Sequence, residues 1–147
     1  MRLIIAGDHA GLELKTELLA HLKAAGHDVQ DLGVATNDSV DYPDYARKVA
    51  EALSGSSGLL GVLVCGTGIG MSIMANKFHG VRAALCTTEF EAKMARAHSD
   101  ANVLCLGQRV VGSGVARAIA DAFLATPFEG GRHQGRVDKI NEADGKR

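Results

Sequence analysis

Short apolar runs alternate with segments of helical period along this chain. The runs at residues 3–6, 60–65, 81–86 and 103–106 are continuous and largely aliphatic, as strands covered on both faces are, and residues 27–32 form a weaker fifth run. Between the runs, apolar residues recur every three or four positions, as on one face of a helix. They are Leu14, Leu18 and Leu22; Tyr45, Val49, Ala52 and Leu53; and Val115, Ile119, Ala122 and Phe123. The pattern predicts strands and helices in alternation.

Helix start signals agree with this alternation. Asp41 before Pro43 suits an N-cap followed by a first turn, and Thr88 with Glu91 three residues later has the pattern of a capping box. Five strands with intervening helices imply right-handed crossovers and a parallel sheet. We therefore expect an α/β protein with a Rossmann-like, doubly wound, five-stranded parallel sheet. A single domain should cover residues 1–147, with its core at about residues 1–126.

Ligands of such sheets bind beyond the carboxyl ends of the strands. In this chain, the residues expected at that edge are Asp8, Cys65, Thr87 and Gly107. A candidate site should therefore be sought there.

The last part of the chain departs from the alternation. Residues 128–131 follow Pro127 and break the pattern, and residues 132–143 then form a polar helical sequence without a strong apolar stripe. Such a helix gains little by packing on its own core. We expect this C-terminal extension, residues 127–147, to dock on a partner subunit.

The composition narrows the classes of partner. Sixteen basic side chains nearly balance seventeen acidic ones, without a run of lysine or arginine, so the charge pattern favours neither nucleic acid nor a membrane surface. Residues 1–7 are too short for the apolar part of a signal peptide, and no apolar run approaches the roughly twenty residues of a membrane span. We expect a cytoplasmic protein.

The three cysteines, Cys65, Cys86 and Cys105, have no CxxC spacing among them. This argues against a disulfide framework and against structural zinc. Cys86 and Cys105 fit the role of small buried hydrophobic residues. Cys65 precedes a predicted helix, and helix N-termini favour thiolates, so it is a candidate base or nucleophile.

A glycine-rich loop follows the strand predicted at residues 60–65. Residues 64–72, VCGTGIGMS, lead into a helix, where backbone N–H groups and the helix dipole favour an anion. Glycine lets a ligand approach the backbone, and Thr67 adds a hydroxyl donor. The loop lacks the lysine of a P-loop, which argues against an NTP-binding site of that kind. It also lacks the third glycine of the dinucleotide fingerprint, although Glu89 lies at about the spacing expected for the acid that binds the ribose of a dinucleotide. Tight strand-to-helix packing without a ligand is the alternative interpretation.

Other polar residues are candidates with alternatives of their own. Asp8 and His9 follow the first strand and offer an acceptor and a donor for sugar hydroxyls, or else cap a helix. His98 ends the helical stretch at residues 90–97, where a histidine commonly interacts with the helix dipole. Arg132 and Arg136 are four residues apart, so both would lie on one helix face with His133 adjacent, in an arrangement that suits a phosphate dianion.

For the two arginines, a solvated helix face is the alternative. The remaining histidines, His21, His27 and His79, have no polar company in the sequence pattern and are expected at the surface.

Five motifs, taken in order, make the chain similar to a known family. They are AGDHAG at residues 6–11, DYPDYA at 41–46, CGTGIGMSIMANKFHGVRAA at 65–84, NVLCLGQRVVG at 102–112 and FEGGRHQGRV at 128–137. Together they resemble the ribose-5-phosphate isomerase B family, which also includes galactose-6-phosphate isomerase subunits. The resemblance extends from residue 2 to about residue 140.

The resemblance implies an aldose–ketose isomerase that interconverts ribose 5-phosphate and ribulose 5-phosphate through an enediolate, without a metal or another cofactor. Cys65 would be the base that moves the proton between C1 and C2, and His98 would assist ring opening. The remaining implied contacts are Thr67, Gly66, Gly68, Ile69 and Gly70 for the enediolate oxygens; Asp8, His9, Tyr42 and Ser99 for the sugar; and Arg109, Arg132, His133 and Arg136 around the phosphate. A homodimer or dimer of dimers with shared sites is also implied.

Two positions bear on this interpretation. Met71 stands where one branch of the family has a glutamate base, which leaves Cys65 as the candidate. Ser99 stands where members commonly have an asparagine that contacts a sugar hydroxyl, so tetrose, allose or galactose phosphates stay open as substrates. A non-catalytic phosphosugar-binding module is the competing function, and a redox role for Cys65 is a third.

Overall fold

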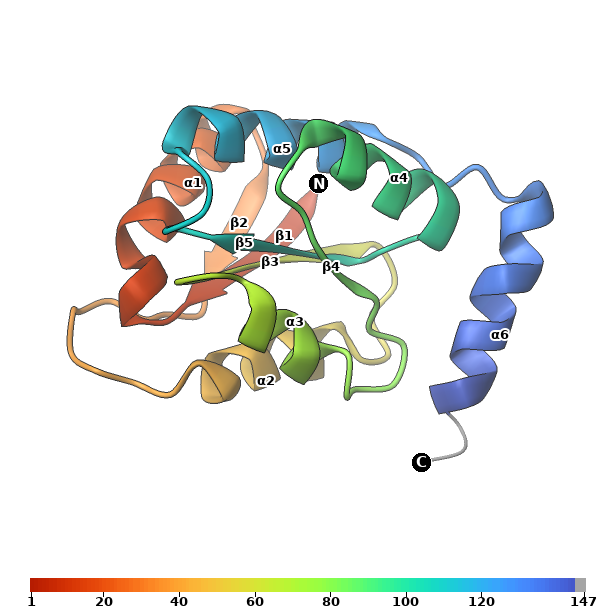
Figure 1. Ribbon diagram of the computed structural model, residues 1–147, viewed down its shortest axis with the longest axis horizontal. Coiled ribbons are helices and arrows are strands. Elements are labelled where there is room, and N and C mark those ends of the chain that lie inside the picture. The colour runs from red at the N-terminus through yellow and green to blue at the C-terminus, as the bar shows by residue number, and fades with distance from the viewer. Residues whose placement is uncertain (145–147) are drawn as a thin grey trace.

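A five-stranded parallel sheet forms the centre of the computed structural model, which describes residues 1–144 (Figure 1). Its strands are β1 Arg2–Gly7, β2 Asp28–Asp31, β3 Leu59–Cys65, β4 Ala83–Leu85 and β5 Val103–Gly107, in the order β2-β1-β3-β5-β4. All four strand pairs are parallel. The predicted Rossmann-like, doubly wound sheet is thereby confirmed.

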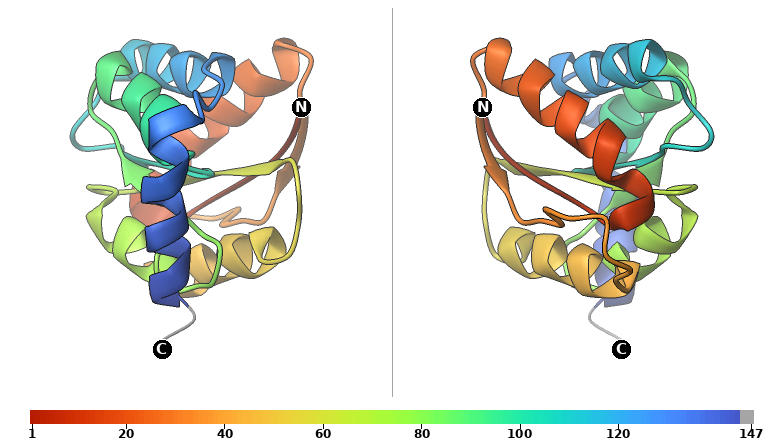
Figure 2. Two further views of the ribbon diagram at one scale, coloured as in Figure 1. Left: turned by 90° about the vertical axis from the view of Figure 1, so that its right-hand side faces the viewer. Right: turned by 90° about the vertical axis from the view of Figure 1, so that its left-hand side faces the viewer.

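Helices cover both faces of the sheet. They are α1 Leu12–Ala24, α2 Tyr42–Leu53, α3 Ile69–Ala75, α4 Glu89–Ser99, α5 Ser113–Ala125 and α6 Gln134–Asp144, with short 3-10 helices η1 His9–Gly11 and η2 Gly131–His133. Helices α1, α4 and α5 lie on one face, and α2 and α3 lie on the other (Figures 1 and 2). Within residues 1–144, no helix has both the length and the apolar character needed to cross a membrane.

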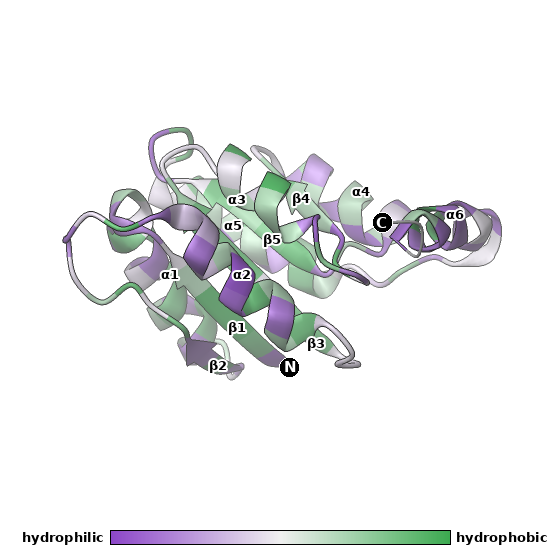
Figure 3. Ribbon diagram, turned by 90° about the horizontal axis from the view of Figure 1, so that it is seen from below, coloured by the Kyte–Doolittle hydropathy of each residue, from purple (hydrophilic) through white to green (hydrophobic). Residues whose placement is uncertain are grey.

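The two faces of each strand pack into two separate cores. In β1, Leu3 and Ile5 join the side chains of α1, α4 and α5, whereas Ile4 and Ala6 join those of α2 and α3. Because successive side chains of a strand point to opposite faces, a strand covered on both sides needs apolar residues at every position. This explains the continuous apolar runs. The outer side of α2 is hydrophilic (Figure 3).

Two of the predicted elements are shorter than expected, and one cap differs. The run at residues 27–32 forms a strand over Asp28–Asp31, and that at residues 81–86 over Ala83–Leu85. The capping box of Thr88 and Glu91 is confirmed. Asp41 stands at the N-cap of α2, but its side chain makes no capping bond; its backbone carbonyl accepts from the Asp44 N–H at 3.2 Å instead.

Helix α6 stands apart from the other helices, beside the β4 edge of the sheet (Figures 1 and 2). It begins at Gln134, later than predicted, because Gly130 and Gly131 have positive φ angles of 64° and 53° and turn the chain into η2. Arg132 therefore lies in η2 and not on the helix face of Arg136. Of the expected extension, residues 145–147 lie outside the described part of the chain.

A buried lysine ties α1 to the segment that leads from β2 towards α2. Lys15 is 1% exposed, and its Nζ donates to both carboxylate oxygens of Asp31, at 2.8 and 2.7 Å, and to the carbonyl of Val34 at 2.8 Å. The same segment pairs with the end of β1, where the Gly7 N–H donates to the Gly33 carbonyl and the Val34 N–H to the Gly7 carbonyl. All three ammonium hydrogens thus have an acceptor.

We expect Lys15→Met to lower the free energy of unfolding by about 2–3 kcal/mol, because it leaves Asp31 and the Val34 carbonyl without their cation. The lower end of the range reflects the partial exposure of Asp31, which lets water replace part of the lost interaction. Urea unfolding at a fixed protein concentration measures the change. Lys23→Met, an exposed position of the same helix, is the control and should change stability by less than about 0.5 kcal/mol. Equal losses in both variants would contradict the structural role of Lys15.

Candidate active site

The carboxyl ends of β1 and β3 lie side by side at the point where the winding of the sheet reverses. From β1 the chain crosses to β2 on one side, whereas β5 and β4 extend the sheet on the other side of β3. Loops diverge at such a point and leave a crevice, which is where ligands of doubly wound sheets bind. The residues that end these two strands, Asp8 with His9 and Cys65 with its glycine loop, therefore define the candidate site.

The loop after β3 turns back sharply on the sulfur of Cys65. Cys65 is 5% exposed, and its Sγ accepts a hydrogen bond from the Gly68 N–H at 3.1 Å. Gly68 has a φ of 78°, in the left-handed region, and a Cβ at this position would lie 2.6 Å from the Leu85 Cδ1. Only glycine fits both the backbone angle and the space. The loop therefore directs a backbone N–H at the thiol.

Neighbouring residues shape the rest of the loop. Thr67 is exposed, and its Oγ1 accepts a hydrogen bond from the Ile69 N–H at 3.3 Å. A Cβ at Gly107 would lie 2.6 Å from the Thr67 carbonyl carbon, so the loop rests directly on the end of β5. A Cβ at Gly70 would lie 2.5 Å from the Tyr42 ring, which places that ring against the loop.

Asp8 and His9 follow the end of β1 at the same edge of the sheet. Asp8 is 6% exposed and uses Oδ1 to accept from the Ala10 and Gly11 N–H groups at 3.0 and 3.1 Å. The helix-capping interpretation of Asp8 is therefore correct for this oxygen. The Nδ1 of His9 accepts from the Val40 N–H at 3.2 Å, which assigns the proton of a neutral ring to Nε2. His9 is thus left with an N–H donor.

Arg109 completes this carboxyl-edge group. Its backbone N–H donates to the Gly66 carbonyl at 3.0 Å, and its Nη1 lies 3.6 Å from where a Cβ of Gly66 would be. The structure therefore brings together Asp8, His9, Tyr42, residues 65–70 and Arg109 at one edge of the sheet. Their roles stay predictions, and Arg109 lies apart from Arg132 and Arg136, with which the resemblance grouped it around the phosphate. Sequence position alone does not show that Tyr42 and Arg109 flank the loop from two sides.

The other two cysteines differ from Cys65 in their surroundings. Cys86 is buried, and burial, reinforced by the nearby Glu91 carboxylate, raises its pKa to about 12. Complete burial also raises the pKa of Cys105. Both stay protonated at neutral pH and act as small hydrophobic residues, as predicted. Met71, at the position where a glutamate base was considered, is fully buried in the core formed with α2.

The remaining predicted site residues lie at the opposite, amino edge of the sheet. In Figure 1, β3 and β5 end at the left, whereas α4 ends at the right beside α6. Residue Ser99 ends α4, and Val103 then begins β5, which reaches the level of Cys65 only at Gly107. Five strand residues separate these two levels by roughly 13 Å. Within one chain, the structure therefore does not bring His98, Ser99, Arg132, His133 or Arg136 to Cys65.

These amino-edge residues form a group of their own around two stacked imidazoles. The rings of His98 and His133 are 4.1 Å apart between centroids and 8° from parallel. The Nε2 of His133 lies 3.4 Å and that of His98 3.9 Å from Oε2 of Glu129. Sequence reasoning missed Glu129; its spacing of four from His133 was the one available signal.

The charge state of His133 follows from its surroundings. Burial lowers its pKa, and the positive charges of His98, Arg132 and Arg136 lower it further, while Glu129 acts in the opposite direction. The Nε of Arg132 donates to Nε2 of His133 at 3.5 Å. His133 is therefore neutral at neutral pH.

The same three side chains are spaced closely enough to hold a metal ion. Ligand atoms of His98, Glu129 and His133 all lie within 4.8 Å of one another. The arginine guanidinium against His133, however, opposes a cation there and suits an anion. The expected absence of a metal stays a prediction.

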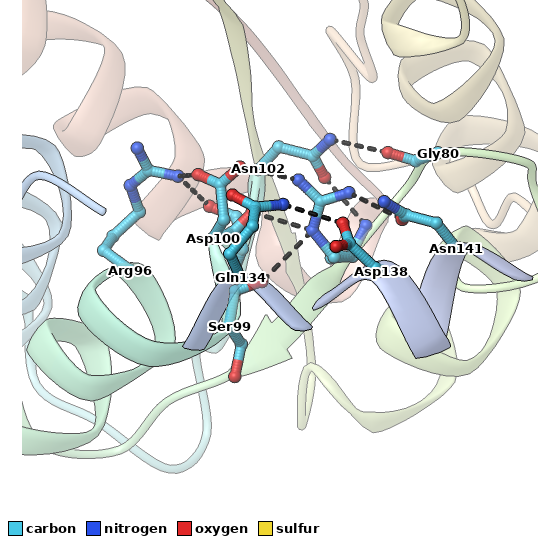
Figure 4. A network of polar contacts seen from close by, with 10 residues as sticks. Gly80, Arg96, Ser99, Asp100, Asn102, Gln134, Asp138 and Asn141 are labelled. Carbon is cyan, nitrogen blue, oxygen red and sulfur yellow. Dashed lines mark hydrogen bonds and ion pairs between the residues drawn. The ribbon is translucent and has the colours of Figure 1, made fainter. Parts of the chain in front are cut away.

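A polar network holds the amino-edge group in place (Figure 4). Arg82 donates from Nε to the carbonyls of Ser99 and Asp100, from Nη2 to the Asp100 carboxylate at 3.0 Å, and from Nη1 to Asn141 of α6 at 3.3 Å. Arg96 donates to the same carboxylate at 2.9 Å. The Ser99 side chain points away from this network, so its hydroxyl is available to a ligand.

Two of the histidines expected at the surface have polar partners. The Nε2 of His21 lies 2.7 Å from an oxygen of Asp121 on α5, and the Nδ1 of His27 lies 3.4 Å from the amino terminus. The expectation of no polar company was wrong because both partners are distant in sequence. His79 is exposed, as predicted.

Comparison with known proteins shows extensive similarity. A family model described as Ribose/Galactose Isomerase matches residues 3–140. Ribose-5-phosphate isomerase B of Escherichia coli is 47% identical over 140 residues, covering 95% of this chain and 94% of that protein.

Solved structures are similar over nearly the whole chain. The ribose-5-phosphate isomerase B of Clostridium thermocellum is 50% identical, with a TM-score of 0.96 and 99% of each chain covered. That of Mycoplasma genitalium, solved with bound ribulose-5-phosphate, is 46% identical, with a TM-score of 0.96 and coverage of 99% of this chain and 97% of that one. This chain therefore belongs to the ribose/galactose isomerase family.

Proposed function

We propose that this protein is an aldose–ketose isomerase that interconverts ribose 5-phosphate and ribulose 5-phosphate in the cytoplasm. The observation that carries the proposal is the thiol of Cys65, which lies at the sheet's switch point under a loop of backbone N–H groups. Similar proteins named for this activity, one of them solved with ribulose-5-phosphate, support it.

The chemistry needs a base and a nearby set of donors. Isomerisation moves a proton between C1 and C2 of the open-chain sugar, and negative charge develops on the carbonyl oxygen as the enediolate forms. Cys65 supplies the base. The Thr67 hydroxyl and the N–H groups of Gly66, Thr67 and Gly70 supply donors that are already in place before the charge develops, while the Gly68 N–H is directed at the sulfur. Since Met71 cannot take a proton, the base is the thiol.

The rest of the substrate is held by residues at both edges of the sheet. Asp8 and the Nε2–H of His9 offer an acceptor and a donor for sugar hydroxyls, and Tyr42 covers the loop. Arg109 lies at the same edge, whereas Arg132 and Arg136 are exposed at the other. Binding of the distant phosphate fixes the orientation of the reacting carbons.

Two copies of the chain are needed for one complete site. A two-fold axis can place the carboxyl edge of one subunit, with Cys65, against the amino edge of its partner, with the partner's His98, and it does so twice. Exposed apolar residues surround the carboxyl edge of the chain and suit burial at such an interface: Ile69, Ile73, Leu85 and Phe90. We therefore propose a homodimer or a dimer of dimers with shared sites, in which α6 contacts the partner.

To identify the substrate, we would measure the rate of aldose-to-ketose conversion by the purified protein without added metal or nucleotide. The sugars compared are ribose 5-phosphate, allose 6-phosphate, galactose 6-phosphate and erythrose 4-phosphate. We expect ribose 5-phosphate to be converted fastest. Ser99→Asn should raise its kcat/KM by up to about tenfold, the effect of one added hydrogen bond. Faster conversion of another sugar would change the substrate, and no conversion of any would favour the binding-module function.

The base is tested by Cys65→Ala. We expect kcat for ribose 5-phosphate to fall by at least about a thousandfold, because no other group can take the C2 proton, while the Kd of ribulose 5-phosphate changes by less than about threefold. Steady-state kinetics and calorimetry provide the two values. Cys86→Ala is the control. Because that thiol lies in the core, this variant should retain activity. Unchanged turnover of Cys65→Ala would refute the assigned base.

The shared site is tested by mixing two inactive variants. Equal amounts of the Cys65→Ala and His98→Gln chains are unfolded together and refolded. About half of the resulting dimers should then contain one chain of each kind, and each such mixed dimer holds one intact site and one doubly altered site. About a quarter of the wild-type activity should therefore return. Separately refolded variants are the control. If both halves of the site belonged to one chain, mixing would restore no activity.

A further inference from the structure

Glu129 occupies a defined position beside the imidazole pair of His98 and His133. Its Oε2 lies 3.9 Å from Nε2 of His98 and 3.4 Å from Nε2 of His133, while the two rings stack at 4.1 Å. One carboxylate thus faces the polar edge of both rings. This carboxylate belongs neither to the proposed base and its donors nor to the proposed substrate contacts.

The main chain determines this position. The Glu129 N–H donates to the Ala97 carbonyl at 3.1 Å, which attaches residue 129 to the last turn of α4, next to His98. Gly130 and Gly131, with their positive φ angles, then return the chain so that His133 packs on His98. The carboxylate and both rings are therefore held by backbone geometry, although the Glu129 side chain is 57% exposed.

The two imidazoles differ in their ability to carry a proton. His133 is 3% exposed, and its Nδ1 is buried without a hydrogen-bond partner within residues 1–144, so a positive charge on this ring would lack solvation. His98 is 40% exposed at its side chain and has the Glu129 carboxylate within ion-pair distance. Of the two rings, His98 therefore has the surroundings that suit a proton donor.

We propose that Glu129 is a positioning residue that, with neutral His133 stacked against the ring, holds protonated His98 in the orientation needed to open the sugar ring. The proposal rests on the proposed function and its shared site. The Glu129 carboxylate lies at ion-pair distance, 3.9 Å, from Nε2 of His98 and fixes that side of the ring, which leaves Nδ1 to act on the substrate bound by the partner subunit.

Ring opening of ribose 5-phosphate needs a proton donor at the ring oxygen and a proton acceptor at the C1 hydroxyl. The bond between C1 and the ring oxygen breaks, its electron pair goes to that oxygen, and His98 gives this oxygen a proton. The C1 hydroxyl loses its proton to water as the aldehyde forms. His98 ends neutral and regains a proton from water, so neither an oxidant nor another reactant is required.

An assay that bypasses ring opening separates this role from a general structural one. Ribulose 5-phosphate has its terminal hydroxyl esterified and cannot close to a furanose, so it enters the site already open. Exchange of its C1 proton in deuterated water requires the base and the loop, but not His98. Turnover of ribose 5-phosphate requires all of them.

We expect Glu129→Gln to lower kcat for ribose 5-phosphate by about 10- to 100-fold, the range seen when an orienting partner of a functional histidine is lost. The rate of C1 exchange in ribulose 5-phosphate should stay within about twofold of wild type. His98→Gln should show the same pattern with a larger loss. Glu129→Asp, which keeps the charge, should recover part of the turnover.

Glu142→Gln is the matched control, since it removes an exposed carboxylate of α6 that lies nine residues, or about 13 Å of helix, beyond His133. It should leave both rates unchanged. Equal losses of turnover and exchange in Glu129→Gln would overturn the proposal, as would no loss of turnover. Absence of both reactions in the wild-type protein would instead refute the proposed function.

Discussion

Close contact between backbones at the carboxyl edge is the constraint on which the candidate site depends. A Cβ at Gly11 would lie 2.4 Å from the Val64 carbonyl oxygen, and one at Gly107 would lie 2.6 Å from the carbonyl carbon of Thr67. The start of η1, the glycine loop and the end of β5 therefore touch without side chains between them. This contact brings Asp8 to the same edge of the sheet as Cys65, where the Gly68 N–H is directed at the sulfur. Any side chain at these glycines would separate the groups that the chemistry needs together.

The arrangement of charges divides the molecule into two functional edges. The carboxyl edge has the thiol, the loop and one arginine, Arg109, whereas the amino edge has the imidazole pair and Arg132 and Arg136. The Arg82 network organises the amino edge in the same way that the glycines organise the other, with hydrogen bonds in place of backbone contact. Each edge is therefore ordered by contacts within a single chain.

Much of this architecture could be predicted from the sequence, for reasons that individual residues make clear. Apolar residues at every position from Leu3 to Ala6 identify a strand covered on both faces, and Thr88 with Glu91 identifies a helix start, because these signals are local. The motifs also contain the residues that the structure brings together at the carboxyl edge. Contacts between distant segments could not be predicted: His21 with Asp121, Lys15 with Asp31, and Glu129 with His98 are all determined by packing. The delayed start of α6 depends on the positive φ angles of two glycines, which a helical pattern does not reveal.

The attachment of α6 has a consequence for how the protein responds to mild denaturation. Of its residues in the described part of the chain, only Val137 is buried, and its links to the body include Asn141 with Arg82 and Asp144 with the Gly80 N–H. A helix with so little apolar contact opens at a lower free energy than the sheet, as a separate cooperative unit. Its amide hydrogens should exchange with solvent while those of β3 stay protected. Arg136 moves with this helix, so the opening would take its guanidinium away from the amino edge while the sheet stays folded.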